Sequence, residues 1–199
     1  MKPFKLAILI VVFSSCNFNF QEKNLPILSF KINEMGVKEY YTISYKDFTN
    51  QFNEKFTTDN IKNKVCIANF FFTRCPSICP PMRQELIKLA ENLKDIDDFM
   101  IISHTIDMSY DSVEILNNYW QTTEIPAIKW QFLRSSEANT KAQAKQFMTN
   151  FRPNEDGSDF YHSSFVALID KKQQIRGFYN TSTPIEMERL IEDIKVLID

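Results

Sequence analysis

Two cysteines separated by three residues, Cys75 and Cys79, are the side chains best placed for chemistry in this chain. They lie between a buried-strand pattern and a helical pattern, and ligands of open α/β sheets bind where strands end. A helix N-terminus stabilises a thiolate and lowers the pKa of a cysteine placed there. Two thiolates that converge can chelate one soft metal ion, such as Cu(I), Zn(II) or cluster iron, or they can close a disulfide. A static disulfide that only staples the loop is the alternative, and the position at a strand end disfavours it.

The prolines that follow the pair indicate where the helix begins. Pro80 and Pro81 each disfavour helical geometry in the residue before them. We therefore expect the helix to begin at Pro81, and both sulfurs to lie in a loop over its N-terminus.

A metal held by two thiolates is under-coordinated, so a third ligand is expected. His162 follows a polar loop and opens a strand pattern. If that strand runs antiparallel to the one that ends at Phe72, His162 lies at the same sheet edge as the cysteines. His104, the other histidine, lies inside a strand pattern, which favours a hydrogen-bonded structural role.

Two carboxylates, Asp107 and Asp111, follow the strand that contains His104. Asp107 could shuttle a proton or position a partner, or it could cap the next helix together with Asp111. We expect the capping role for Asp111, directly before the helix start at Ser112. Cys66 lies in the middle of a strand and is expected to be a small buried hydrophobe.

The composition excludes several classes of function. The chain has 199 residues, which fits one domain, and a net charge of −2, which disfavours a nucleic-acid partner. Only 3 glycines are present, so neither a G-x-G-x-x-G motif nor a P-loop can exist. Only 2 histidines are present, so a multi-histidine metal cage is impossible, and a four-cysteine zinc site would need all 4 cysteines.

The N-terminus has the pattern of a leader peptide. Lys2 and Lys5 precede a short apolar run, and small residues then precede Cys16, as in a bacterial lipobox. We predict a lipoprotein signal over residues 1–15, lipidation of Cys16, a tether over 16–35 and one domain over 36–199. The mature chain would carry a charge of −4, because the leader holds two lysines and no acid. It would be lipid-anchored in the bacterial cell envelope, facing the extracytoplasmic side, where disulfides persist. An ordinary apolar stretch with a chance cysteine is the alternative.

The elements that position these residues are predicted from hydrophobic periodicity and turn signals. Alternating strands and helices, then a hairpin and a helix, predict an α/β fold with a mixed sheet, preceded by an N-terminal β-hairpin extension. Strands are expected at residues 40–45, 48–57 (with a turn at 53–54), 65–72, 99–106, 130–133, 164–169 and 174–179. Helices are expected at 81–93, 112–120, 137–147 and 184–198, and a polar loop at 150–159.

The chain resembles the Sco/SenC copper-binding, thioredoxin-like proteins. The resemblance is carried by residues 64–80 with the C-x-x-x-C-P motif, by 103–107 with Asp111, and by 162–165 with Asp170. It implies a thioredoxin-like mixed sheet flanked by helices, and copper, Cu(I) or Cu(II), bound by Cys75, Cys79 and His162. It also implies assembly of the dinuclear copper centre of cytochrome oxidase, by copper delivery, by reduction of that site's cysteines, or by both. The partner would be the copper-accepting subunit of cytochrome c oxidase or another copper protein.

Three functions remain open at this point. In a metallochaperone, Cys75, Cys79 and His162 hold copper and pass it on by ligand exchange. In an extracytoplasmic thiol–disulfide oxidoreductase, the two cysteines form a redox pair without metal. A peroxidase-like or sensor protein on the same fold ranks last. The presence of His162 favours the metallochaperone, because thiol exchange does not require a third ligand.

Overall fold

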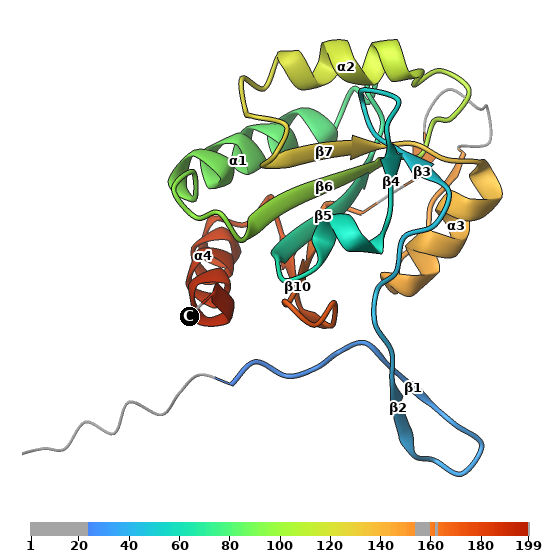
Figure 1. The fold of residues 1–199 in the computed structure, drawn as a ribbon, viewed down its shortest axis with the longest axis vertical. Helices are drawn as coiled ribbons and strands as arrows, with labels where there is room; N and C mark the ends of the chain where they lie inside the picture. The colour runs from blue at the N-terminus through green and yellow to red at the C-terminus, as the bar shows by residue number, and fades with distance from the viewer. Residues whose placement is uncertain (1–23, 154–159, 162, 199) are drawn as a thin grey trace, which may run out of the picture.

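The computed structural model describes residues 24–153, 160–161 and 163–198. Its centre is a five-stranded mixed sheet with the strand order β11-β10-β5-β6-β7 (Figure 1). The three strands β5, β6 and β7 are parallel, β10 is antiparallel to β5, and β11 is antiparallel to β10. The strand bounds are β5 Val65–Phe71, β6 Phe99–Thr105, β7 Trp130–Leu133, β10 Phe165–Ile169 and β11 Ile175–Asn180.

Helices cover both faces of this sheet (Figure 1). On one face Asn69 of β5 contacts Met82 of α1, and Tyr179 of β11 contacts Asp193 of α4. On the other face Phe70 of β5 packs against Phe147 at the end of α3. The helix α2 packs on the α1 face beside β7, where Tyr119 lies 5.7 Å from Phe132 between ring centroids. The helices are α1 Cys79–Asn92, α2 Val113–Gln121, α3 Glu137–Gln146 and α4 Pro184–Ile198.

Burial on both faces explains the strand composition. All seven residues of β5 and all seven of β6 are buried, as expected for parallel strands covered by helices on both sides. The α/β prediction with a mixed sheet is confirmed, and each predicted element from 99 to 147 and from 164 to 198 is present within two residues of its expected ends. Ser112 caps α2 as predicted, accepting a hydrogen bond from the amide of Ile115 at 3.2 Å.

The N-terminal part differs from the prediction. The strand expected at 40–45 is wrong, because β2 ends at Tyr40 and pairs with β1 as a separate hairpin. Beyond Tyr40, the amides of Tyr41 and Ile43 bond instead to the carbonyls of Ser29 and Gln173. The region predicted as a tether contains β1, and Leu28 donates to Ile175 of β11 at 2.7 Å. The bounds are β1 Phe30–Ile32 and β2 Lys38–Tyr40.

The hairpin predicted over 48–57 is confirmed, with Asn53 at its turn in the left-handed region at φ 62°. It consists of β3 Phe48–Thr49 and β4 Lys55–Phe56, followed by the 3₁₀-helix η1 Thr58–Ile61. The polar loop predicted over 150–159 contains β8, Arg152–Pro153, which pairs with β9, Phe160–Tyr161. The strand expected to open at His162 begins later, at Phe165.

The start of α1 also corrects the prediction. The helix begins at Cys79, not at Pro81, and Met82 donates its amide hydrogen to the carbonyl of Ile78 at 3.2 Å. The first amides of a helix lack partners within the helix, so Pro80 and Pro81 lose nothing there. This tolerance of proline in the first turn outweighs its effect on the preceding residue. Within the part of the chain that the structure covers, no helix is long and apolar enough to cross a membrane.

Candidate functional site

The two cysteines of the C-x-x-x-C motif converge at the N-terminus of α1. Cys75 lies in the loop after β5, and Cys79 is the first residue of the helix. Both are buried, with 6% and 3% of their surface exposed. The backbone N–H of Cys79 points at the sulfur of Cys75, with 3.4 Å between N and Sγ. A helix N-terminus aimed at a sulfur stabilises its thiolate form.

The loop before Cys75 is fixed by Asp111. This fully buried carboxylate accepts hydrogen bonds from the amide of Thr73 at 3.2 Å, from the Thr73 hydroxyl, and from the Thr105 hydroxyl. Burial raises the pKa of Asp111, and the hydrogen bonds from the two threonines oppose that shift. The capping role predicted for Asp111 is therefore wrong: Ser112 caps α2, while Asp111 ties the cysteine loop to the end of β6.

Asp107 holds the next residue of the same loop. Its Oδ2 lies 2.7 Å from Nε of Arg74, and its Oδ1 accepts from the Ser109 hydroxyl at 2.7 Å. Only 1% of the Asp107 side chain is exposed, whereas 47% of the Arg74 side chain is exposed. The Arg74 guanidinium lies over the Tyr110 ring, 4.9 Å from its centroid. Asp107 thus fixes a cation directly beside Cys75.

The wall behind Cys79 is formed by Arg83 and Tyr119. The Arg83 guanidinium lies 5.0 Å from the centroid of the Tyr119 ring. The pKa of Tyr119 is raised by burial, against a lowering by Arg83, and the nearby sulfurs of Cys79 and Cys75 raise it further. Sequence reasoning missed both residues. Helical spacing from Cys79 could have indicated Arg83, but nothing in the sequence indicates Tyr119.

Position 162 lies outside the described residues, as does Cys16, but its neighbours reach the cysteine end of the sheet. Because β10 is antiparallel to β5, with Ala167 opposite Ala68, β10 begins at the end where β5 finishes. The ring of Phe160 packs edge-on against Phe72, at 5.2 Å between centroids. Both observations agree with the antiparallel arrangement expected for this segment.

His104 occupies a different environment, inside the core. Its Nδ1 donates to the carbonyl oxygen of Asn69 at 3.0 Å, and its ring is stacked between Tyr45 and Phe70. Burial lowers the pKa of His104 to about 4, so the ring is neutral at pH 7. The structural role predicted for His104 is confirmed. Cys66 is fully buried as predicted, and burial raises the pKa of its thiol to about 12.

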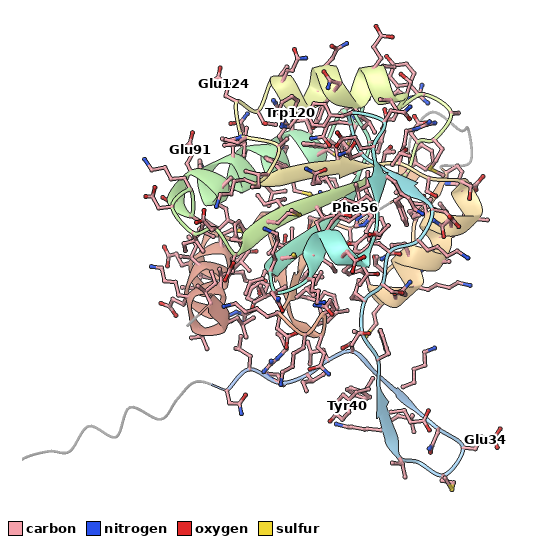
Figure 2. The ribbon with its side chains drawn as sticks, viewed as in Figure 1. Glu34, Tyr40, Phe56, Glu91, Trp120 and Glu124 are labelled. Atoms are coloured by element: carbon pink, nitrogen blue, oxygen red, sulfur yellow. The ribbon has the colours of Figure 1, made fainter. Side chains whose placement is uncertain are left out.

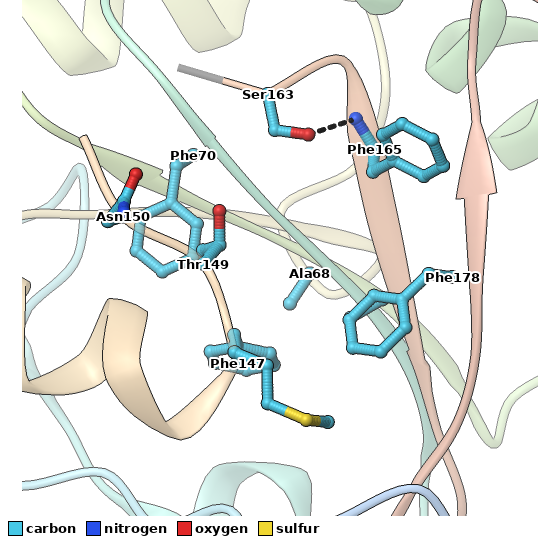
Figure 3. A pocket seen from close by; sticks show the side chains of 10 residues that line it. Ala68, Phe70, Phe147, Thr149, Asn150, Ser163, Phe165 and Phe178 are labelled. Carbon is cyan, nitrogen blue, oxygen red and sulfur yellow. Dashed lines mark hydrogen bonds between the residues drawn. The ribbon is translucent and has the colours of Figure 1, made fainter. Parts of the chain in front are cut away.

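A pocket of about 200 Å³ opens on the α3 face of the sheet (Figure 3). Phe70 and Phe147 form one wall, and Phe165 and Phe178 form the other. Ser163 lies at its rim and accepts a hydrogen bond from the amide of Phe165 at 3.1 Å. The pocket therefore has aromatic walls with polar side chains, Thr149, Asn150 and Ser163, among its lining, and it adjoins the segment that leads to position 162.

The described residues alone do not complete a metal site. Among residues 24–153, 160–161 and 163–198, no group of three histidine, cysteine, aspartate or glutamate side chains is arranged to hold a metal ion. The pair Cys75 and Cys79 supplies two soft ligands. A third ligand must come from elsewhere, and His162 remains a prediction.

Comparison with known proteins identifies the family. The SCO1/SenC family model matches residues 37–199. A SCO1/SenC family lipoprotein from Bacillus anthracis is 27% identical, with a TM-score of 0.73 over 87% of this chain and 98% of that one. BsSco, a member of the Sco family of cytochrome c oxidase assembly proteins with a disulfide switch, is 26% identical, with a TM-score of 0.69 over 79% and 94%. Copper-bound ScoI from Arabidopsis thaliana, 22% identical with a TM-score of 0.66 over 78% and 96%, shares the fold. The thioredoxin-like fold is thus confirmed, and the chain belongs to the SCO1/SenC family.

Proposed function

We propose that this protein binds copper through Cys75, Cys79 and His162 and assists the assembly of cytochrome c oxidase. The observation that carries the proposal is the convergence of two buried thiols at the first turn of α1, where the Cys79 N–H lies 3.4 Å from the Cys75 sulfur. The association of BsSco with cytochrome c oxidase assembly and the copper bound to Arabidopsis ScoI support the same role.

The donor set suits copper as a cargo. Thiolates are soft ligands that favour Cu(I), and an imidazole nitrogen binds either Cu(I) or Cu(II). The loop that carries Cys75 is tied to two buried carboxylates, Asp111 through Thr73 and Asp107 through Arg74. Because the loop is already held in place, little conformational entropy is lost when its thiol binds the metal. Three ligands leave room for a ligand of the acceptor, so copper can pass by stepwise ligand exchange.

The topology around position 162 supports His162 as the third ligand. The strand β10 begins at the sheet end where β5 runs into the cysteine loop, and Phe160 packs on Phe72. These contacts place Phe160 and the start of β10, on either side of position 162, at the cysteine end of the sheet. His104 is ruled out as a ligand, because it lies within the core with its Nδ1 committed to Asn69.

An anaerobic copper titration of the reduced chain tests this assignment. We expect one copper per chain for the wild type, loss of tight binding in Cys75→Ser and Cys79→Ser, and sharply weaker binding in His162→Ala. Cys66→Ala is the matched control, because its thiol is equally buried but lies near the start of β5, at the end of the strand away from the cysteine loop; it should bind like the wild type. Unchanged binding by His162→Ala would refute the three-ligand site.

A second function on the same residues is thiol–disulfide exchange, which the disulfide switch of BsSco supports. Oxidation of the Cys75 and Cys79 thiols to a disulfide releases two electrons and two protons, which convert a partner's disulfide into two thiols. This function predicts turnover with a protein disulfide in the absence of metal, and a measurable reduction potential for the pair. A dithiol that reduces no partner under metal-free conditions would eliminate it.

The N-terminal assignments complete the proposal. Residues 1–15 would be removed as a lipoprotein signal, and a lipid on Cys16 would anchor the domain to a bacterial membrane, facing the extracytoplasmic side, through the part of the predicted tether that precedes Leu25. Both segments resemble those expected of a lipoprotein, and the B. anthracis relative is a lipoprotein. Mass spectrometry of the membrane fraction should find a lipidated Cys16 at the new N-terminus. Cys16→Ser should leave the precursor unprocessed; processing elsewhere would contradict the assignment.

A further inference from the structure

The β1–β2 hairpin extends away from the body of the domain and forms a sheet of its own (Figure 1). In its register Phe30 faces Tyr40 and Ile32 faces Lys38, so these four side chains share one face. Ile32 is 58% exposed and Tyr40 is 54% exposed. Figure 2 shows Tyr40 and the tip residue Glu34 well apart from the side chains of the main sheet.

The hairpin tip concentrates exposed apolar surface. Met35 and Val37, on either side of the turn at Gly36, are 82% and 55% exposed. Of the 11 large apolar side chains exposed in the described part of the chain, four lie between residues 32 and 40. An isolated two-stranded hairpin is marginally stable in water, and a contiguous apolar patch usually marks an interaction surface. The exposed apolar side chains of the hairpin therefore indicate a surface that binds a partner or a membrane.

The attachment point of the hairpin separates it from the cysteines. Its base is held at the turn between β10 and β11, where Leu28 donates to Ile175 and Ile43 donates to Gln173. That turn follows Ile169, which pairs with Cys66 near the start of β5. The cysteine loop follows the other end of β5. The hairpin and the cysteines thus lie at opposite ends of the central strand.

The preceding chain approaches from the hairpin side. The guanidinium of Arg176 holds Leu25 and Pro26 through their carbonyl oxygens, beside β11. Eight residues, 17–24, separate the proposed lipid attachment at Cys16 from Leu25, where the chain is held beside β11, and a fully extended segment of that length spans about 28 Å. A bilayer that holds the lipid therefore lies on the side of the domain that carries the base of the hairpin.

We propose that the β1–β2 hairpin is a membrane-contact element whose tip, Met35 and Val37, enters the interface of the anchoring bilayer. The hairpin then orients the domain with the cysteine loop directed away from the membrane. Nearness to the bilayer rests on the proposed anchor, but the affinity of the hairpin for lipid does not. Lys31 and Lys38 balance Glu34 and Glu39, so apolar insertion, not charge attraction, drives the contact.

The test uses the chain from residue 16 onward with Cys16→Ser, which keeps every described residue and carries no lipid. In this background Met35→Trp reports insertion into phosphatidylcholine vesicles that contain brominated lipid. We expect its emission to shift to shorter wavelength and to be quenched. Ile185→Trp, at a site 68% exposed elsewhere on the domain, should show neither change. Adding anionic lipid should alter the binding little.

Paired substitutions measure the contribution of the tip. Met35→Ser/Val37→Ser should weaken vesicle partitioning about tenfold, because two apolar side chains leave the interface. Ile128→Ser/Ile185→Ser removes two side chains of similar exposure away from the hairpin and should partition like the parent. Equal partitioning of both double variants, or an unquenched Met35→Trp, would overturn the proposal. Failure of lipidation at Cys16 would leave these results unaffected, so the two proposals fail separately.

Discussion

Protonation of His104 is expected to destabilise the domain in mild acid. Its imidazole is fully buried between the rings of Tyr45 and Phe70, and its pKa is about 4 in the folded protein. In the unfolded chain the pKa returns to about 6.5. At a pH between these two pKa values, His104 is protonated in the unfolded state but neutral in the folded state. The free energy of unfolding therefore falls as the pH falls through 6.5 and stops falling near 4.

The two pKa values give the size of the effect. Proton linkage at a single site predicts a loss of about 2 kcal/mol at pH 5 relative to pH 7.5, and about 3 kcal/mol once the pH is well below 4. The pH 5 value is the useful one, because most carboxylates are still ionised there. A loss of this size is a large fraction of the stability of an ordinary domain.

Urea unfolding of the wild type and His104→Phe at pH 7.5 and 5.0 measures this contribution. Phenylalanine keeps an aromatic ring between its neighbours but loses the hydrogen bond to the Asn69 carbonyl, which costs about 1 kcal/mol at pH 7.5. At pH 5 the order should reverse, with the variant more stable by about 1 kcal/mol. Other titrating groups are common to both proteins and cancel. A stability difference independent of pH would refute the argument.

Two further substitutions and one labelling reaction test individual contacts of the domain. Asp107→Asn should lower stability by about 1 kcal/mol in urea unfolding, a modest loss because Arg74 is half-exposed and its ion pair is screened; a loss above 3 kcal/mol would contradict this. Cys66 should react with iodoacetamide at pH 8 about a thousandfold more slowly in the folded protein than in urea, as peptide mapping can measure, because its thiol pKa is raised to about 12. Ser112→Ala should cost about 1 kcal/mol in thermal unfolding through loss of the cap on Ile115, with no change in copper binding.

Elements were predicted correctly where the local sequence pattern and the packing in the fold favour the same structure. A continuous apolar run becomes β5, which is buried on both faces, and Pro184 begins α4 at the first-turn position that proline prefers. The left-handed backbone at Asn53 produces the predicted turn. At the site, the positions of the two histidines relative to strand ends distinguished them: His104 was predicted to be a core residue and His162 a candidate ligand. For His104 the structure supports that distinction.

Elements that depend on distant partners were not predictable in this way. The residues after Tyr40 have a strand-like composition, but their amides bond singly to Ser29 and Gln173 instead of to a neighbouring strand. The role of Asp111 depends on Thr73, 38 residues earlier. A carboxylate directly before a helix cap carries the same local pattern whether it caps the helix or binds a distant loop. Only the fold distinguishes the two.

The corrected start of α1 changes what the cysteine pair can do. If both sulfurs lay in a loop over the helix, they would be interchangeable as ligands or as redox partners. Because Cys79 is the first helical residue, its own N–H is directed at the Cys75 sulfur, 3.4 Å away. The helix N-terminus therefore favours negative charge on Cys75. Cys75 also lies on the loop that Asp107 and Asp111 tie down, whereas Cys79 is held by the helix itself. The thiolate that first meets a metal ion or a partner's disulfide is thus expected to be that of Cys75, with Cys79 completing the chelate or the disulfide.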